Sequence, residues 1–122
     1  MKNYRDLEIF RDAKSLAIEV HKMSMTLPKF ELYEEGSQLR RCTKSVAALI
    51  VEGYGRKKVK SDFIKYLTYA HAECDEALVH LEFLKETGSL IDNSTFLRLS
   101  DGYVALSKKI NNFIQYVETS WR

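Results

Sequence analysis

Apolar residues recur along this chain at alternating steps of three and four, the spacing that places side chains on one face of an α-helix. The first stripe occupies residues 9–27 and is followed by Pro28. Its members are Ile9, Ala13, Leu16, Val20, Met23 and Leu27. Proline disfavours helical geometry in the residue before it, so we expect the first helix to end at Pro28.

Three further stripes predict three further helices. We expect the second helix to close around Gly53 and Gly55, because glycine can adopt the left-handed conformation that ends many helices. The third helix is expected to start with Ser61 as its cap and to stop at Gly88, which gives a rod roughly 40 Å long. The fourth is expected to begin near residues 92–94. The three stripes consist of Leu39, Cys42, Val46, Leu49 and Ile50; of Phe63, Leu67, Ala70, Cys74, Ala77, Leu81 and Leu84; and of Phe96, Leu99, Tyr103, Leu106, Ile110, Phe113 and Val117.

The segments between these stripes are short, at about residues 28–33, 55–60 and 88–93. No segment alternates polar and apolar residues convincingly over the length of a strand. Short connections between long helices favour antiparallel neighbours. The pattern therefore predicts an all-α fold, an antiparallel up-down-up-down four-helix bundle, with residues 1–122 forming a single domain.

Composition narrows the class of protein. Of the 122 residues, 45% are hydrophobic and 30% are charged, which is typical of a folded globular protein. No apolar run approaches the roughly 20 residues that span a bilayer, and the N-terminal residues lack the apolar stretch of a signal peptide. We therefore expect a cytoplasmic protein that does not enter a membrane, with Cys42 and Cys74 as small core residues.

The net charge of +2 is unevenly distributed along the chain. Residues 36–65 contain eight basic and two acidic side chains, a local charge of +6. Residues 66–122 have a local charge of −3, and residues 1–35 have a local charge of −1. An asymmetry of this kind indicates an anionic partner, or contact between oppositely charged surfaces of neighbouring copies.

Few residues suggest catalysis or metal binding. Residues 71–74 read His-Ala-Glu-Cys, and His-x-Glu opens the signature of zinc nucleobase deaminases. That site also needs a downstream Pro-Cys-x-x-Cys, but the only proline is Pro28 and no cysteine follows Cys74. Glu76 and His80 stand one helical turn apart, which is more typical of a surface pair than of a metal site. The sequence therefore predicts a protein that is not an enzyme and uses neither a metal nor a cofactor.

The turn between the second and third predicted helices concentrates positive charge. Residues 55–60, here called the basic turn, contain four cations: Arg56, Lys57, Lys58 and Lys60. Tyr54, Tyr66 and Tyr69 are near enough in the sequence to stack on bases while the cations neutralise phosphates. The same cations also suit a solvated turn beside a helix C-terminus. The residues alone leave both interpretations open.

Several short motifs resemble a known family. They are Leu7 to Phe10, Leu27-Pro28, Ser37-Gln38-Leu39-Arg40-Arg41 and Glu52-Gly53-Tyr54-Gly55-Arg56. With these motifs the chain resembles the four-helix bundle proteins that are encoded in intervening sequences of bacterial 23S ribosomal RNA genes, also called S23 ribosomal proteins. Residues 45–50 depart from the family pattern because they lack its proline and asparagine, and Ala72-Glu73 replaces a Gly-Ser.

The resemblance implies a cytoplasmic bacterial protein that assembles with itself into a ring-like homopentamer. A related group with a similar fold, the accessory proteins of diversity-generating retroelements, implies binding of nucleic acid through basic surface. We therefore expect a non-enzymatic oligomer that binds the RNA or DNA backbone with little sequence preference. The expected binding residues are Arg40, Lys44, Arg56, Lys57, Lys58 and Lys60. The alternative is a scaffold or accessory subunit whose basic surface engages another protein with an acidic surface.

Arg41 is expected to have a structural role instead. If the second and third helices form a hairpin centred near Lys58, residues at the same height have numbers that add to about 117. Arg41 and Glu76 satisfy this relation, and each lies next to an apolar stripe. We therefore predict an ion pair between them, either within one chain or between two subunits.

Overall fold

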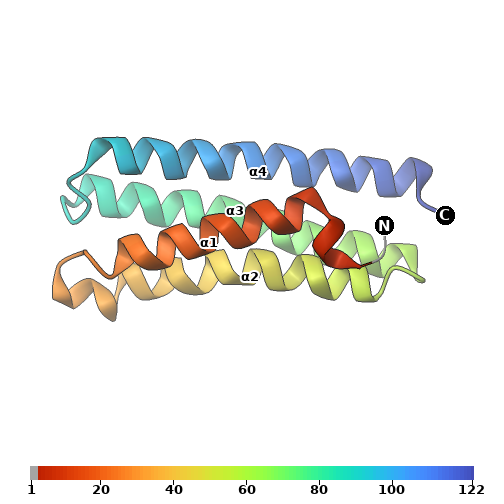
Figure 1. Ribbon diagram of the computed structural model, residues 1–122, viewed down its shortest axis with the longest axis horizontal. Helices are drawn as coiled ribbons and strands as arrows, with labels where there is room; N and C mark the ends of the chain where they lie inside the picture. The colour runs from red at the N-terminus through yellow and green to blue at the C-terminus, as the bar shows by residue number, and fades with distance from the viewer. Residues whose placement is uncertain (1–2) are drawn as a thin grey trace.

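Four long helices make up most of the protein (Figure 1). The computed structural model describes residues 3–122. The helices are α1 (Glu8–Ser24), α2 (Glu35–Gly55), α3 (Lys60–Glu86) and α4 (Asn93–Ser120). Two short 3-10 helices, η1 (Tyr4–Asp6) and η2 (Lys29–Leu32), precede α1 and α2. The described residues contain no strand, which confirms an all-α fold with four helices.

Each helix packs along two others. Figure 1 shows the four helices side by side, with the connections between them at alternating ends of the molecule. α1 contacts α2 and α4, and α3 contacts α2 and α4. The surface between α1 and α2 therefore lies on the opposite side of the molecule from the surface between α3 and α4.

The predicted apolar stripes form the core. Val46, Phe63, Leu81 and Tyr103 are fully buried, together with most members of the four stripes. Burying each large apolar side chain contributes about 1.5–3 kcal/mol, so the stripes hold the helices together. Among the described residues, no helix is long and apolar enough to cross a membrane.

Two helix ends differ from the sequence expectation. α1 ends at Ser24, before Pro28, and the short helix η2 follows the proline. The hydroxyl groups of Ser24 and Thr26 donate to the carbonyls of His21 and Met23, which satisfies backbone acceptors at this end. α3 begins at Lys60 after Val59, which offers no side-chain cap, so the prediction of Ser61 as the cap was wrong.

Two other ends are as expected. Gly88 has a φ of 84°, the left-handed conformation that stops α3. The Asp92 side chain accepts a hydrogen bond from the backbone N–H of Ser94 and caps α4.

The glycines of α2 do not end it by a left-handed turn. Gly88 is the only described residue with a positive φ, and α2 continues through Gly53 and ends at Gly55. A Cβ atom at Gly53 would lie 3.1 Å from Cβ of Tyr66 and 3.4 Å from the Phe63 ring. Gly53 therefore lets α2 and α3 approach closely near their connection, and the prediction of a left-handed conformation there was wrong.

Candidate nucleic-acid interface

Arg56, in the basic turn, is surrounded by carboxylates. Its Nη2 atom lies 3.1 Å from Oε1 of Glu52, and its Nη1 atom lies 3.9 Å from Oδ2 of Asp62. The guanidinium also lies over the Tyr66 ring, 5.0 Å from its centroid. The hydrogen bond that Arg56 donates to Glu52 raises the pKa of Arg56, so the guanidinium stays charged while the Glu52 carboxylate compensates that charge locally.

The aromatic residues near the turn are mostly occupied by packing. Tyr54 is only 8% exposed, and its ring meets Phe63 and Trp121 at centroid distances of 6.2 and 6.5 Å. The ammonium of Lys57 lies 4.1 Å from the centroid of the Tyr54 ring. A buried ring with a cation on its face cannot also stack on a base, so Tyr54 serves the core.

The remaining two cations of the basic turn are accessible. Lys58 and Lys60 are exposed, and within residues 3–122 no ion pair joins either of them to a carboxylate. The basic turn therefore offers two fully accessible cations, Lys58 and Lys60, while Lys57 keeps its charge but lies on the Tyr54 ring and Arg56 is paired with carboxylates.

Arg40 does not belong to an open binding surface. Its Nη1 atom donates to Oγ of Ser24 at 3.0 Å, and its Nη2 atom donates to the carbonyl of Leu32 at 2.7 Å. These two bonds join the start of α2 to the end of α1 and to η2. Arg40 was expected to face the ligand, but its guanidinium is engaged within the chain. We therefore leave it out of the proposed interface.

Arg41 and Glu76 lie at the same height, as the hairpin register predicts. Both line a small cavity of about 180 Å³ between α2 and α3. Within residues 3–122, however, no ion pair joins them, and Oε1 of Glu76 lies 3.5 Å from Nε2 of His80. The prediction of an ion pair inside one chain was therefore wrong, and a pair between subunits stays a prediction.

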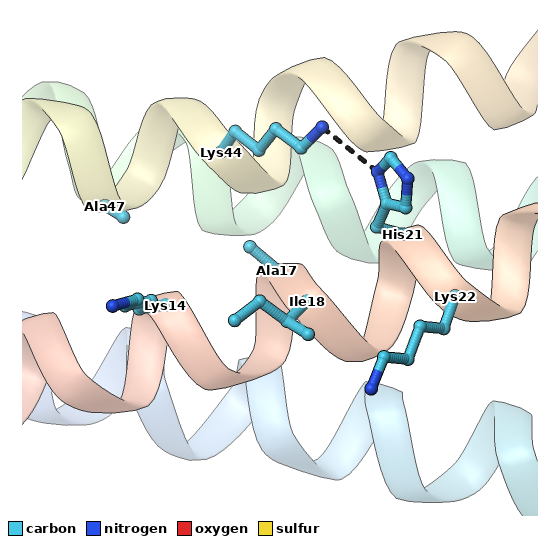
Figure 2. A pocket seen from close by; sticks show the side chains of 7 residues that line it. All are labelled: Lys14, Ala17, Ile18, His21, Lys22, Lys44 and Ala47. Carbon is cyan, nitrogen blue, oxygen red and sulfur yellow. Dashed lines mark hydrogen bonds between the residues drawn. The ribbon is translucent and has the colours of Figure 1, made fainter.

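Lys44 belongs to a different surface, a groove between α1 and α2 (Figure 2). The groove has a volume of about 330 Å³. Its lining, here called the α1–α2 groove, consists of Lys14, Ala17, Ile18, His21, Lys22, Lys44 and Ala47. No carboxylate lines this part of the described structure. Figure 2 shows Lys44 reaching toward His21, Ala17 pointing toward α2, Ile18 in front of the α1 ribbon and Lys22 pointing away from α2. The groove therefore combines uncompensated cations with an apolar floor.

The charge pattern of α1 explains how this surface arises. Lys14, Ile18 and His21 follow each other at steps of four and three and share the edge that faces α2. The acidic residues of α1 occupy the opposite edge. There Glu8 and Asp12 lie 2.9 and 2.8 Å from Nζ of Lys109 on α4. α1 contains three acidic and three basic side chains, and its carboxylates lie toward α4 while Lys14 and His21 lie toward α2.

A hydrogen bond joins the two walls of the groove. Nζ of Lys44 lies 3.1 Å from Nδ1 of His21. An ammonium can only donate, so the imidazole nitrogen accepts and carries no proton when this bond is formed. The bond holds the Lys44 ammonium at the mouth of the groove, where an anionic ligand would meet it.

Sequence reasoning missed Lys14, Lys22 and His21. Charge density along the chain does not reveal them, because they lie in a segment whose total charge is slightly negative. The helical period contained a signal for two of them, because Lys14 and His21 recur on the edge toward α2 and the carboxylates of α1 on the opposite edge. Sorting the charges of α1 by helix face would have found the surface.

The two other histidines and the two cysteines have structural surroundings and no evident chemical role. Nε2 of His71 lies 3.0 Å from Oγ of Ser107, and Nδ1 of His80 lies 2.5 Å from Oε2 of Glu35. Burial raises the pKa of the Cys42 and Cys74 thiols to about 12, so neither is a thiolate at neutral pH. The described residues include no group of three or more histidine, cysteine, aspartate or glutamate side chains that could hold a metal ion.

Comparison with known proteins identifies the family. A crystal structure of a protein of unknown function from the S23 ribosomal protein family of Bacteroides thetaiotaomicron is similar, with a TM-score of 0.76 and 20% sequence identity over 87% of this chain and 97% of that chain. Similarity at this identity supports the fold. Comparison with curated proteins gave no match. A family model described as 23S rRNA-intervening sequence protein matches residues 5–112. The chain therefore belongs to the family of 23S rRNA-intervening sequence proteins.

Proposed function

We propose that this protein is a non-enzymatic oligomer that binds the backbone of RNA or DNA through the α1–α2 groove. The observation that carries this proposal is the grouping of Lys14, Lys22 and Lys44 around one groove whose lining contains no carboxylate. Lysines neutralise phosphates and release the counterions that surround a nucleic acid, which favours binding of any sequence. Lys58 and Lys60 of the basic turn add two exposed cations beyond the end of α2.

Assembly of several copies of the chain would multiply the contacts between lysines and phosphates. Tyr69, Val79 and Phe83 leave an exposed apolar stripe on α3, with exposed fractions of 46%, 46% and 51%. A stripe of this kind supports contact with another protein surface, and we propose that it joins copies of this chain in a ring-like pentamer. We also propose that the helices run in an antiparallel up-down-up-down order, which the short connections at alternating ends support. We further propose that the protein is located in the cytoplasm.

The proposal is tested by measuring affinity for RNA and DNA as a function of salt. If three lysines contact phosphates, the logarithm of the association constant for duplex DNA should fall by about 2.7 per log unit of salt, at 0.9 per contact. The triple variant Lys14→Glu, Lys22→Glu and Lys44→Glu should lose binding at all salt concentrations. The matched control Lys58→Glu with Lys60→Glu should weaken binding much less.

The protein-scaffold alternative gives a different result. A wild-type protein that binds neither RNA nor DNA at low salt, but captures an acidic protein, would overturn the proposal in favour of that alternative. Native mass spectrometry tests the assembly separately. Five copies of the 14.2 kDa chain give about 71 kDa, whereas a species of 14.2 kDa would exclude the oligomer.

A further inference from the structure

The floor of the α1–α2 groove is apolar, which a site for phosphate groups alone does not require. Ala17 and Ile18 of α1 and Ala47 of α2 form this floor. The Ile18 side chain is 46% exposed, so a ligand in the groove would cover apolar surface that water now contacts. The groove therefore suits a ligand that presents an apolar face as well as negative charge.

The cations are spaced around this floor. Lys14 and Lys22 are eight residues apart on α1, which corresponds to about 12 Å along the helix, and Ile18 lies midway between them. Lys44 approaches from α2 and is held at the mouth of the groove by His21 (Figure 2). A ligand lying along α1 would thus meet a charge, an apolar patch and a second charge, with a third charge from the facing wall.

We infer that the α1–α2 groove takes single-stranded RNA or DNA in preference to a duplex, with phosphates at the lysines and an unpaired base against Ile18 and Ala47. This inference rests on the proposed function. A duplex keeps its base faces stacked inside and turns its phosphates outward. A single strand exposes both phosphates and base faces, and proteins that bind it combine a positive groove with aromatic side chains on which the bases stack. In this groove the apolar side chains of Ile18 and Ala47 offer the base a surface instead.

The lysines favour any nucleic acid because its backbone is anionic, and the apolar floor favours a single strand over a duplex. The groove has a volume of only about 330 Å³, so its floor suits a single small group and not the width of a duplex. An unpaired base can lie against Ile18 in such a groove, whereas a duplex would meet mainly the lysines.

The experiment compares an unstructured oligouridine or oligothymidine strand with a hairpin duplex that has the same number of phosphates. Fluorescence anisotropy of labelled strands gives the affinity of the native assembly over a range of salt concentrations. A polyglutamate peptide of the same charge serves as an anion without bases. We expect the single strand to bind more tightly than the hairpin and far more tightly than the peptide.

A matched pair of variants isolates the floor. Ile18→Ser removes apolar surface and changes no charge, so we expect it to weaken binding of the single strand by about 3- to 10-fold. It should leave the salt dependence and the affinity for the hairpin unchanged. Leu97→Ser is the control, because Leu97 is 49% exposed on α4 and belongs neither to the groove lining nor to the exposed stripe of α3.

The outcomes separate this inference from the proposed function. Equal affinity for strand and hairpin, together with no effect of Ile18→Ser, would overturn the inference and leave backbone binding in place. Equal affinity for polyglutamate would show that the groove recognises charge alone and would also overturn it. Failure of both nucleic acids to bind at low salt would remove the proposed function and the inference together.

Discussion

The basic turn and the α1–α2 groove are both rich in cations, but their charges have different surroundings. In the turn, Glu52 and Asp62 lie beside Arg56, and the Tyr54 ring lies beneath Lys57. In the groove no carboxylate approaches the lysines within the described structure. The turn has the higher charge density along the sequence, yet each region has three lysines without a carboxylate partner, and only the groove places its lysines around an open apolar floor. Surface charge is therefore decided by what each cation meets in space.

The two regions also differ in what lies beneath them. The turn rests on an aromatic cluster in which Phe63 and Trp121 have ring centroids 5.2 Å apart, and Gly53 leaves room for the Cβ atom of Tyr66. The groove is floored by two alanines and a half-exposed isoleucine. Dense packing supports stability and an open floor supports binding. Mutations in the turn should therefore affect folding, and mutations in the groove should affect ligands.

The largest effect is expected from Tyr54→Ala. It removes a buried ring from the aromatic cluster, so the free energy of unfolding should fall by about 3 kcal/mol or more. Urea denaturation followed by circular dichroism measures this loss. Tyr33→Ala, at a position that is 86% exposed after η2, should change the free energy of unfolding by less than about 0.5 kcal/mol. A stable Tyr54→Ala protein that had lost only nucleic-acid binding would make the turn a binding site after all.

Arg40→Gln should have the next largest effect. It breaks the two hydrogen bonds to Ser24 and Leu32, and we expect the free energy of unfolding to fall by about 1.5–3 kcal/mol. Arg41→Gln is the matched control, because Arg41 is exposed and has no ion pair within residues 3–122. Arg41→Gln should change the free energy of unfolding only slightly. Equal losses in both variants would show that Arg41 has a structural partner, such as Glu76 of a neighbouring copy.

A smaller effect is expected from removing the carboxylates that compensate Arg56. Glu52→Gln with Asp62→Asn should expose its charge and strengthen binding of RNA or DNA, by less than about tenfold because surface ion pairs are weak. Glu82→Gln with Glu86→Gln changes the net charge equally at the far end of α3. If both pairs raise affinity alike in a filter-binding assay, the gain comes from total charge and the compensation of Arg56 is irrelevant.

The smallest effect concerns Glu73, beside the cavity between α2 and α3. Burial, and then its hydrogen bond with Glu76, raise the pKa of Glu73. A raised pKa in the folded state means that the protein is relatively more stable while this carboxyl is protonated, and that stability is lost as pH rises through the raised pKa. Glu73→Gln should therefore slightly raise the melting temperature at pH 7, and the gain should vanish near pH 4. A gain of equal size at both pH values would place its origin elsewhere.

Much of the fold follows from the sequence because it depends on local spacing. The apolar stripes of α2, α3 and α4 lie in the core as the period of 3.6 residues predicts. Gly88 and Asp92 mark helix ends because a left-handed glycine and a capping carboxylate act on adjacent backbone groups. Ser61 did not mark the start of α3, because many serines near a helix start have no capping role. The N-cap residue of α3 is Val59.

The candidate site depended on contacts between residues that are distant in the sequence. Arg40 meets Leu32 only because η2 folds back on α2, and Lys109 meets Glu8 across 101 residues. The sequence by itself determined four amphipathic helices and an excess of positive charge in residues 36–65. Only the tertiary structure decided which cations are compensated and which remain available. The physical reason is that helix rotation and packing pair each charge with groups from other helices, and no local period encodes those partners.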